Sequence, residues 1–170
     1  PEKFFDTWVP TSDYGFSKYI MAKWSQYIPN IVNLRLFGCF GNYEDFRIRF
    51  ISNAIWHALH HEDIEIQQNI AFDYLYVNDL VTIIEKLLQK KKLSHRCYNV
   101  CTSKPIDLLT IAKKVKKLVN PQVAIVVRIR GRKPEFSGDN KRLISEIGEF
   151  PFTPIDVAIK KLAQWYRQTP

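Results

Sequence analysis

The 170-residue sequence has no long run of apolar residues, no signal peptide and only three cysteines. No apolar run reaches the about 20 residues that a membrane-spanning helix needs, which argues against a membrane protein. No secretory leader opens the chain, although it starts at Pro1 rather than Met, so we expect the true N-terminus to lie upstream. The cysteines lack the spacing of a disulfide framework, which favours buried thiols in the reducing cytoplasm.

The sequence also lacks a complete glycine-rich nucleotide loop. Gly38-Cys39-Phe40-Gly41 follows a short apolar run, but the third glycine of a Gly-x-Gly-x-x-Gly pattern is missing. No acidic residue ends a following strand at the distance that a dinucleotide site requires. We expect these glycines to let the backbone turn sharply or pass close to a ligand.

No group of residues has the spacing of a metal site. His57 and His61 are four residues apart and can share a helix face, but no third ligand is evident, which favours an exposed helix end. Cys97 and Cys101 lie an even number of residues apart, and burial is favoured over metal binding for them. We therefore expect no metal.

What the sequence has is an excess of positive charge, +8 in total, and a hydrophobic share of 46% that suits a globular protein. The charge is compatible with nucleic-acid binding or with solvated helix faces plus a site for an anionic small molecule. Aromatic interleaving and known nucleic-acid-binding modules are both absent, so we expect no nucleic-acid partner. The basic stretch Arg128 to Lys133 alone is dense enough to suggest an anion site, with a solvated basic loop as the alternative.

Hydrophobic periodicity predicts helices alternating with short strands. The predicted helices cover residues 13–28, 46–60, 78–90, 105–119, 141–147 and 155–167. The predicted strands cover residues 31–37, 64–68, 72–77, 95–100 and 123–129. Alternation of this kind indicates an α/β protein with parallel strands.

Tyr14 and Lys18 are the strongest candidates for chemistry. Thr11, Ser12 and Asp13 are all plausible caps for a helix that begins here. Residues four apart share a helix face, so the phenol and the ammonium can point at one site. A nearby ammonium favours the phenolate form of a tyrosine, which can then exchange a proton. The alternative is an ordinary surface pair on an amphipathic helix.

The surrounding residues resemble the active-site helix of the extended short-chain dehydrogenase/reductases, which include the NAD-dependent sugar-nucleotide epimerases and dehydratases. The matching residues of this helix are Pro10-x-x-x-Tyr14-Gly15-x-Ser17-Lys18. Four further segments occur in the order of the family: Asn33 to Gly41, Phe72 to Leu80, Tyr98 to Ile106, and Asp139 to Arg167. An ordered set of segments is far more specific than any one of them, and it spans nearly the whole chain.

The resemblance implies the carboxyl-terminal part of a Rossmann-like parallel sheet together with a smaller substrate-binding domain. Residues 1–60 would belong to the Rossmann-like part and carry the Tyr-x-x-x-Lys helix. Residues 61–170 would mainly form the substrate domain, with 70–100 returning to the Rossmann sheet. The cofactor-loop half of the family fold would lie upstream, so we expect this chain alone to be incomplete and inactive. Its half-sheet would leave strand faces and edges for the missing half to cover.

The resemblance also implies NAD or NADP as cofactor, a sugar or nucleotide sugar as substrate, and a homodimer when the enzyme is complete. It assigns Tyr14 and Lys18 to catalysis, and both of these with Phe37 and Gly38 to the cofactor. Tyr76, Arg128, Arg130 and Arg132 would contact the substrate. If the strand ran far enough, its three arginines would share one face, since side chains alternate with period two.

Two departures from the family pattern fall in the expected substrate site. The family asparagine is Gly38 here, and its arginine is Phe72. In the family both tend to hold the diphosphate of the substrate, so their loss removes an amide and a bidentate phosphate partner. A noncatalytic binding or assembly role on the same fold therefore remains a second hypothesis. The identity of the sugar, the reaction and the choice of NAD or NADP stay open.

Overall fold

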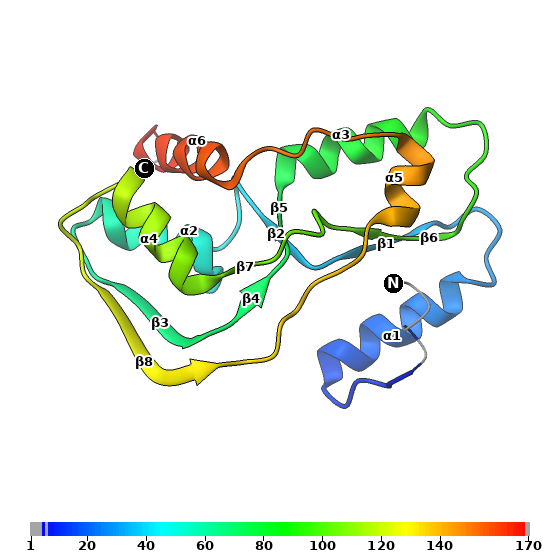
Figure 1. The fold of residues 1–170 in the computed structure, drawn as a ribbon. Coiled ribbons are helices and arrows are strands. Elements are labelled where there is room, and N and C mark those ends of the chain that lie inside the picture. The colour runs from blue at the N-terminus through cyan, green and yellow to red at the C-terminus, as the bar shows by residue number, and fades with distance from the viewer. Residues whose placement is uncertain (1–4, 6, 169–170) are drawn as a thin grey trace.

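The computed structural model describes residues 5 and 7–168 (Figure 1). Its helices are α1 (Asp13–Ser25), α2 (Phe50–Leu59), α3 (Val77–Leu88), α4 (Leu108–Leu118), α5 (Lys141–Ile147) and α6 (Ile155–Gln168). Its strands are β1 (Asn33–Leu36), β2 (Gly38–Phe40), β3 (Ile64–Asn69), β4 (Ala71–Phe72), β5 (Tyr74–Tyr76), β6 (Cys97–Val100), β7 (Ile106–Asp107) and β8 (Ile125–Arg132).

The strands form four pairs, and three of them are parallel. Strand β1 pairs with β6, β2 with β5, and β3 with β8, whereas β4 and β7 are antiparallel. Helix α1 lies on one side of the β1–β6 pair, and α3 and α5 lie on the other (Figure 1). The predicted α/β class with parallel strands is confirmed.

One hydrophobic core joins α2, α4 and α6 with β3. Its fully buried side chains come from the apolar stripes of the three helices, as the 3.6-residue period requires, and from the inward face of β3. They include Ile51, Ile55, Ile66, Ile111, Val115, Ile159 and Leu162. Helix α2 lies within residues 1–60, which the sequence assigned to the Rossmann-like part, yet it packs here with elements from later in the chain.

A second core joins β5 and β6 with α3 and α5. It is built around Leu75, Ile83, Leu87, Tyr98, Val100 and Leu143. Side chains of β1 also pack on it, since Leu34 contacts this cluster. This core therefore supports the face of the β1–β6 pair that is opposite α1.

Two elements have other boundaries than the sequence predicts, and a polar side chain lies at each of these boundaries. Helix α4 begins at Leu108 and not at residue 105, because Ile106 and Asp107 pair with β4 and Asp107 caps the helix. The Asp107 carboxylate accepts a bond of 3.0 Å from the backbone N–H of Thr110. The predicted strand 72–77 is divided into β4 and β5, with Asp73 between them.

Asp73 is fully buried and fastens the β4–β5 corner to the loop after β6. Its carboxylate accepts bonds from the backbone N–H groups of Thr102 and Ser103, both 2.8 Å long, and from the Thr102 hydroxyl at 2.6 Å. A buried carboxylate is tolerated because these donors satisfy it. The contact joins segments that are about 30 residues apart in the chain.

Among the residues that the structure describes, no helix combines the length and the apolar character needed to cross a bilayer.

We predict that Asp73→Ala lowers the free energy of unfolding by about 3 kcal/mol or more, because it removes a fully buried acceptor and leaves three part-buried donors unpaired. Asp156→Ala is the matched control, since it removes a half-exposed carboxylate that pairs with Lys114. That surface pair is worth about 0–1 kcal/mol. Urea denaturation of both variants measures the difference, and equal losses would show that the Asp73 contacts do not hold the corner.

Candidate functional site

The start of α1 is fixed by Ser12. Its hydroxyl accepts a bond of 3.2 Å from the backbone N–H of Gly15, which identifies the cap among the three candidates in the sequence. Gly15 then lies so close to the preceding segment that an added Cβ would be 2.7 Å from the Cβ of Pro10. Gly15 thus lets the start of the helix pack closely against Pro10. This close packing orients the helix that carries Tyr14.

The structure brings Tyr14 and Lys18 together on this helix. The Lys18 ammonium lies 5.5 Å from the centroid of the Tyr14 ring, and the Tyr14 residue is 75% exposed. Both side chains border a cavity of about 910 Å³ that lies between α1 and β1. An exposed phenol next to a cation can exchange a proton with a bound hydroxyl group.

The cavity has mostly apolar walls. Trp8, Met21 and Trp24 line it from the α1 side, and Val32 and Leu36 line it from the β1 side. Asn33 and Arg35 also border it, but Asn33 donates to the Ser25 hydroxyl and Arg35 lies 3.9 Å from the centroid of the Phe5 ring.

Phe37 and Gly38 follow β1 directly, and both are engaged in packing. The Phe37 ring lies 5.4 Å from that of Phe136, centroid to centroid. A Cβ added to Gly38 would be 3.0 Å from the backbone oxygen of Asp73 and 3.2 Å from the Tyr74 ring. A side chain at Gly38 would therefore crowd the β2–β5 pair, whether or not a ligand is bound.

Tyr76 does not join the exposed pair on α1. It lies buried in the core, 5.7 Å from the Phe40 ring. Burial raises the pKa of its phenol, and the nearby charge of Asp79 raises it further. The structure thus separates this expected substrate residue from Tyr14 and Lys18.

The expectation that three arginines share one face meets an irregularity in the strand. Strand β8 does run to Arg132, but its register with β3 shifts: Gln68 pairs with Ile129, while the next residue, Asn69, pairs with Arg132. Arg130 and Gly131 lie in this irregularity, and Gly131 has a φ of 91°. A bulge of this kind interrupts the regular alternation of side chains at Arg130 and Gly131, and pairing resumes at Arg132.

The three arginines also differ in their partners. Arg128 forms an ion pair with Glu65 on the neighbouring strand. Arg132 acts on Asp107: burial tends to raise the pKa of that carboxyl, but bonds from Thr110 and Asn69 and the charge of Arg132 outweigh it and lower the pKa. The side chain of Arg130 has no described ion pair, although its backbone oxygen accepts a bond from Gln68.

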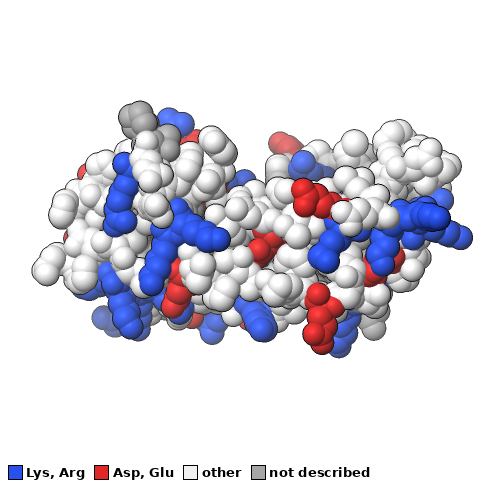
Figure 2. Space-filling view, turned by 90° about the horizontal axis from the view of Figure 1, so that it is seen from above, with Lys and Arg blue, Asp and Glu red and all other residues white. Residues whose placement is uncertain are grey.

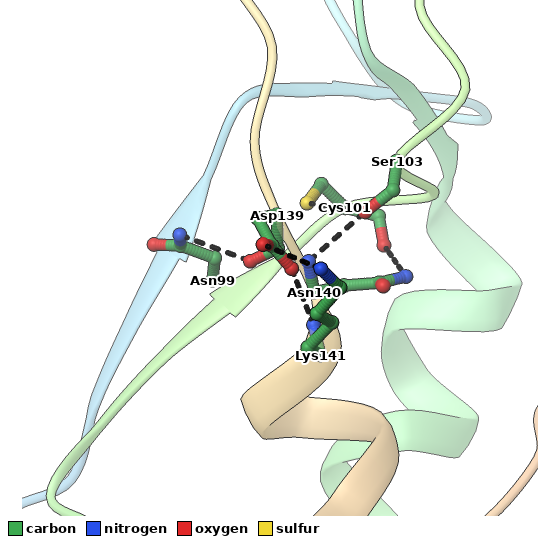
Figure 3. A network of polar contacts seen from close by, with 6 residues as sticks. All are labelled: Asn99, Cys101, Ser103, Asp139, Asn140 and Lys141. Atoms are coloured by element: carbon green, nitrogen blue, oxygen red, sulfur yellow. Dashed lines mark hydrogen bonds and ion pairs between the residues drawn. The ribbon is translucent and has the colours of Figure 1, made fainter. Parts of the chain in front are cut away.

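A polar network that the sequence did not reveal holds the segment after β8 against the end of β6 (Figure 3). The side-chain amide of Asn140 donates to the Cys101 carbonyl at 2.9 Å, and its backbone N–H donates to the Ser103 hydroxyl at 2.9 Å. Asn99 donates to the Asp139 carbonyl at 3.2 Å. The bonded residues of this network are about 40 residues apart in the chain, so no local sequence pattern predicts the network.

A second group missed in the sequence surrounds Glu44, which accepts a bond from the Ser52 hydroxyl. Burial raises the pKa of the Glu44 carboxyl. Burial also raises the pKa of the nearby Cys39 thiol to about 11, with a further rise from the Glu44 charge. These groups fasten the loop before α2, and they make Cys39 a poor nucleophile.

The described residues hold no group of three or more His, Cys, Asp or Glu side chains that could bind a metal ion. Basic residues are scattered over both halves of the face in Figure 2, with acidic residues among them. This face has no continuous basic stripe of the kind that follows a nucleic-acid backbone.

Residues 2–101 match the NAD dependent epimerase/dehydratase family. Because the match covers more than half of the sequence, the chain belongs to this family. No curated protein sequence matches it.

Solved structures with the same fold include sugar-nucleotide enzymes. The dTDP-glucose 4,6-dehydratase of Bacillus anthracis, solved with NAD, is 18% identical, with a TM-score of 0.76 over 94% of this chain and 53% of its own. The UDP-glucuronic acid 4-epimerase of Bacillus cereus, solved with UDP-glucuronic acid and NAD, is 17% identical, with a TM-score of 0.75 over 94% and 54%. The UDP-glucose 4-epimerase of Thermotoga maritima, solved with UDP-glucose, is 17% identical, with a TM-score of 0.71 over 91% and 52%. The chain thus spans about half the length of these proteins.

We predict that Ser12→Ala lowers the free energy of unfolding by about 1 kcal/mol, because the N–H of Gly15 loses its acceptor. Thr11→Ala, one residue earlier, should change it by about 0.5 kcal/mol or less, as most exposed substitutions do. Chemical denaturation followed by circular dichroism compares the two. A larger loss from Thr11→Ala would place the cap elsewhere.

Proposed function

We propose that this chain is the carboxyl-terminal portion of an NAD(P)-dependent epimerase, dehydratase or reductase that acts on a sugar, specifically a nucleotide sugar. The observation that carries the proposal is the pairing of Tyr14 and Lys18 on a capped helix in a member of this family. The pair is exposed, and it borders a cavity. Solved structures of the same fold with NAD and sugar nucleotides support the choice of cofactor and substrate class.

In this proposal Tyr14 exchanges a proton with a hydroxyl group of the sugar. The Tyr14 oxygen carries negative charge when the proton has left, and the ammonium of Lys18 attracts that charge. The capped start of α1 fixes the backbone positions from which both side chains project toward the site. General acid–base catalysis of this kind contributes about 10²–10⁴-fold to a rate.

The residues present fit one part of a nicotinamide cofactor site. The Lys18 ammonium projects beside the cavity and can hydrogen-bond ribose hydroxyl groups, and Tyr14 lies next to it. When bound, the cofactor supplies the hydride chemistry, which the side chains of this chain cannot perform. Phe37 and Gly38 lie at the carboxyl end of β1, where ligands of parallel sheets approach. Their proposed contribution is to shape that end of the site through packing.

The anionic end of the substrate is proposed to meet Arg130 or Arg132. Arg128 has its charge balanced by Glu65, which leaves the two residues at the bulge as the better candidates. The hydrogen bonds of Asn140 hold the chain after β8 near the end of β6. The basic segment that precedes Asn140 is therefore anchored at its carboxyl-terminal side. A guanidinium forms strong paired bonds with phosphate.

Self-association and a cytoplasmic location complete the proposal. Phe16, Ile20 and Tyr27 are exposed and follow each other at helical spacing along and beyond α1, an arrangement that suits packing against another helix in a homodimer. Cys39, Cys97 and Cys101 are free thiols, as expected in a reducing compartment.

A noncatalytic role has one specific observation in its favour. Phe72, which stands at the family arginine, packs on Tyr74 and Phe136 in an aromatic cluster. The ring therefore serves packing where the family pattern has a phosphate-binding cation. A family member that binds a ligand or assembles without turnover would tolerate this change.

We predict that Tyr14→Phe in the complete enzyme lowers kcat by about 10²-fold or more, since only the proton-transfer group is removed. Cofactor affinity should stay nearly unchanged. Tyr27→Phe is the control, because Tyr27 is 76% exposed, much like Tyr14, and lies just beyond the same helix. Steady-state kinetics and calorimetry with NAD provide the measurement, and normal turnover in Tyr14→Phe would remove Tyr14 from catalysis.

We predict that Arg130→Ala or Arg132→Ala raises KM about tenfold or more, because a charge-assisted contact is worth about 1.5–3 kcal/mol. Arg167→Ala, at the far end of α6, should leave KM unchanged. If both single variants and the double variant keep the parental KM, the basic segment is solvated surface and the anion is held elsewhere.

A further inference from the structure

The turn between α3 and β6 is strongly basic and exposed. Three consecutive lysines, Lys90, Lys91 and Lys92, all lie at the surface. Over residues 85–96, five Lys or Arg side chains accompany one carboxylate, that of Glu85. Figure 1 places this turn at one end of the molecule, and Figure 2 shows Lys and Arg side chains gathered at that end. Four of the eight excess positive charges of the chain therefore lie in this stretch.

The three lysines have no acidic partner of their own. None of the ion pairs between described residues includes any of them. The charge of Lys90 acts on Glu146, but that carboxylate already accepts bonds from the Tyr98 hydroxyl at 2.7 Å and from the Ser94 N–H at 2.9 Å. Like charges repel one another, so exposed lysines without carboxylate partners favour contact with an anion from outside the chain.

The backbone of the turn is anchored on both sides of the lysines. Leu87 and Leu93 lie before and after them, and both pack into the second core. The backbone N–H of Lys90 donates to the Leu87 carbonyl at 3.2 Å, and that of Ser94 donates to Glu146. The lysines therefore extend from a backbone that is already folded before it meets a partner.

An exposed apolar side chain precedes the lysines. Leu88 is the last residue of α3 and is 79% exposed, whereas Leu87 is buried in the second core. A single exposed leucine is common on protein surfaces. Next to three lysines without ion-pair partners, however, it gives the turn both parts of a membrane-surface site. Such sites combine Lys or Arg with large apolar side chains.

The surroundings of the turn favour a lipid surface over an acidic peptide. A peptide usually docks in a groove or adds to the edge of a strand. None of residues 85–96 lines the cavity beside α1, and residues 89–96 form no strand. An anionic lipid surface needs neither feature, since it offers headgroup charges to the lysines and an apolar interior to the leucine. No described helix can cross a bilayer, so the contact is peripheral.

We propose that the turn between α3 and β6 is a peripheral binding site for a membrane surface that carries anionic phospholipids. Lys90, Lys91 and Lys92 contact the phosphate and carboxylate groups of the lipid headgroups, and Leu88 enters the apolar boundary below them. The cytoplasmic face of a membrane carries such lipids. The site uses none of the residues of the proposed catalysis, so the two proposals stand independently.

The test measures binding of the complete product of the native gene to lipid vesicles by co-sedimentation. One set of vesicles contains phosphatidylcholine and phosphatidylserine, and the other contains phosphatidylcholine alone. We expect binding to the first set only. We also expect raised salt to weaken this binding, because salt screens interactions between exposed charges.

We expect neutralisation of the three lysines to weaken vesicle binding about 100-fold, since each lysine near an anionic surface adds to the affinity. The variant carries Lys90→Gln, Lys91→Gln and Lys92→Gln. The matched control, on α4, carries Lys113→Gln, Lys116→Gln and Lys117→Gln. Because the control removes the same charge from another helix, it should change binding by about twofold or less. Circular dichroism checks that both variants are folded.

A second variant tests the apolar part of the site. Leu88→Gln should weaken vesicle binding about tenfold, because it removes a large apolar side chain from the lipid boundary. Ile48→Gln is its control, since Ile48 is 75% exposed and precedes α2, which lies at the other end of the molecule (Figure 1). Both residues are at the surface, so the fold should tolerate either substitution.

Four outcomes would overturn the proposal. The first is equal binding to both sets of vesicles, or to neither. The second is an equal loss of binding in the two lysine variants, which would reduce the effect to net charge. The third is equal binding by Leu88→Gln and Ile48→Gln. The fourth is tighter binding to polyglutamate than to the anionic vesicles at the same ionic strength, which would assign the lysines to an acidic protein.

Discussion

The buried carboxylate of Asp73 is the contact on which the arrangement of this molecule depends. It lies at the corner between β4 and β5 and binds the loop after β6, so it fastens together segments from both hydrophobic cores. Its backbone oxygen approaches Gly38 so closely that an added Cβ would lie 3.0 Å away, in a tight contact. The same loop then bonds through Ser103 to Asn140 and fixes the start of α5. One desolvated charge, satisfied by three donors, thus sets the relative positions of β2, β6 and the segment after β8.

Helix α1, in contrast to the corner at Asp73, is held by few buried contacts. It packs on β1 through few buried side chains, namely Ala22 and Ser25, while aromatic and aliphatic residues remain exposed along most of its surface. A helix that is apolar on most sides is normally buried. The helix with the candidate catalytic pair is therefore the element that most needs contacts from outside the described residues. This fits a chain that spans about half the length of the solved structures of its fold.

Much of the fold was predictable because the main signals are local. Period-two and period-3.6 patterns located every helix and most strands, but they missed β2, where a turn was predicted, and β7, which was predicted as the start of a helix. Helix α5 was predicted with the bounds that it has. The pairing of Tyr14 and Lys18 was predictable for the same reason, since positions four apart share a helix face whatever surrounds them. The family followed from the order of several short segments and was confirmed over residues 2–101.

The sequence by itself therefore determined the α/β class, the family and the juxtaposition of Tyr14 with Lys18, because each depends on residues close together in the chain or on their order. Only the tertiary structure decided which side chains face a site. It buried Tyr76 in the core, paired Arg128 with Glu65 and placed a bulge at Arg130 and Gly131, between the other two arginines. It also replaced the expected phosphate contact at Phe72 with an aromatic cluster. These outcomes depend on partners far along the chain, 63 residues away for Arg128 and Glu65, whose charge and volume no local pattern contains.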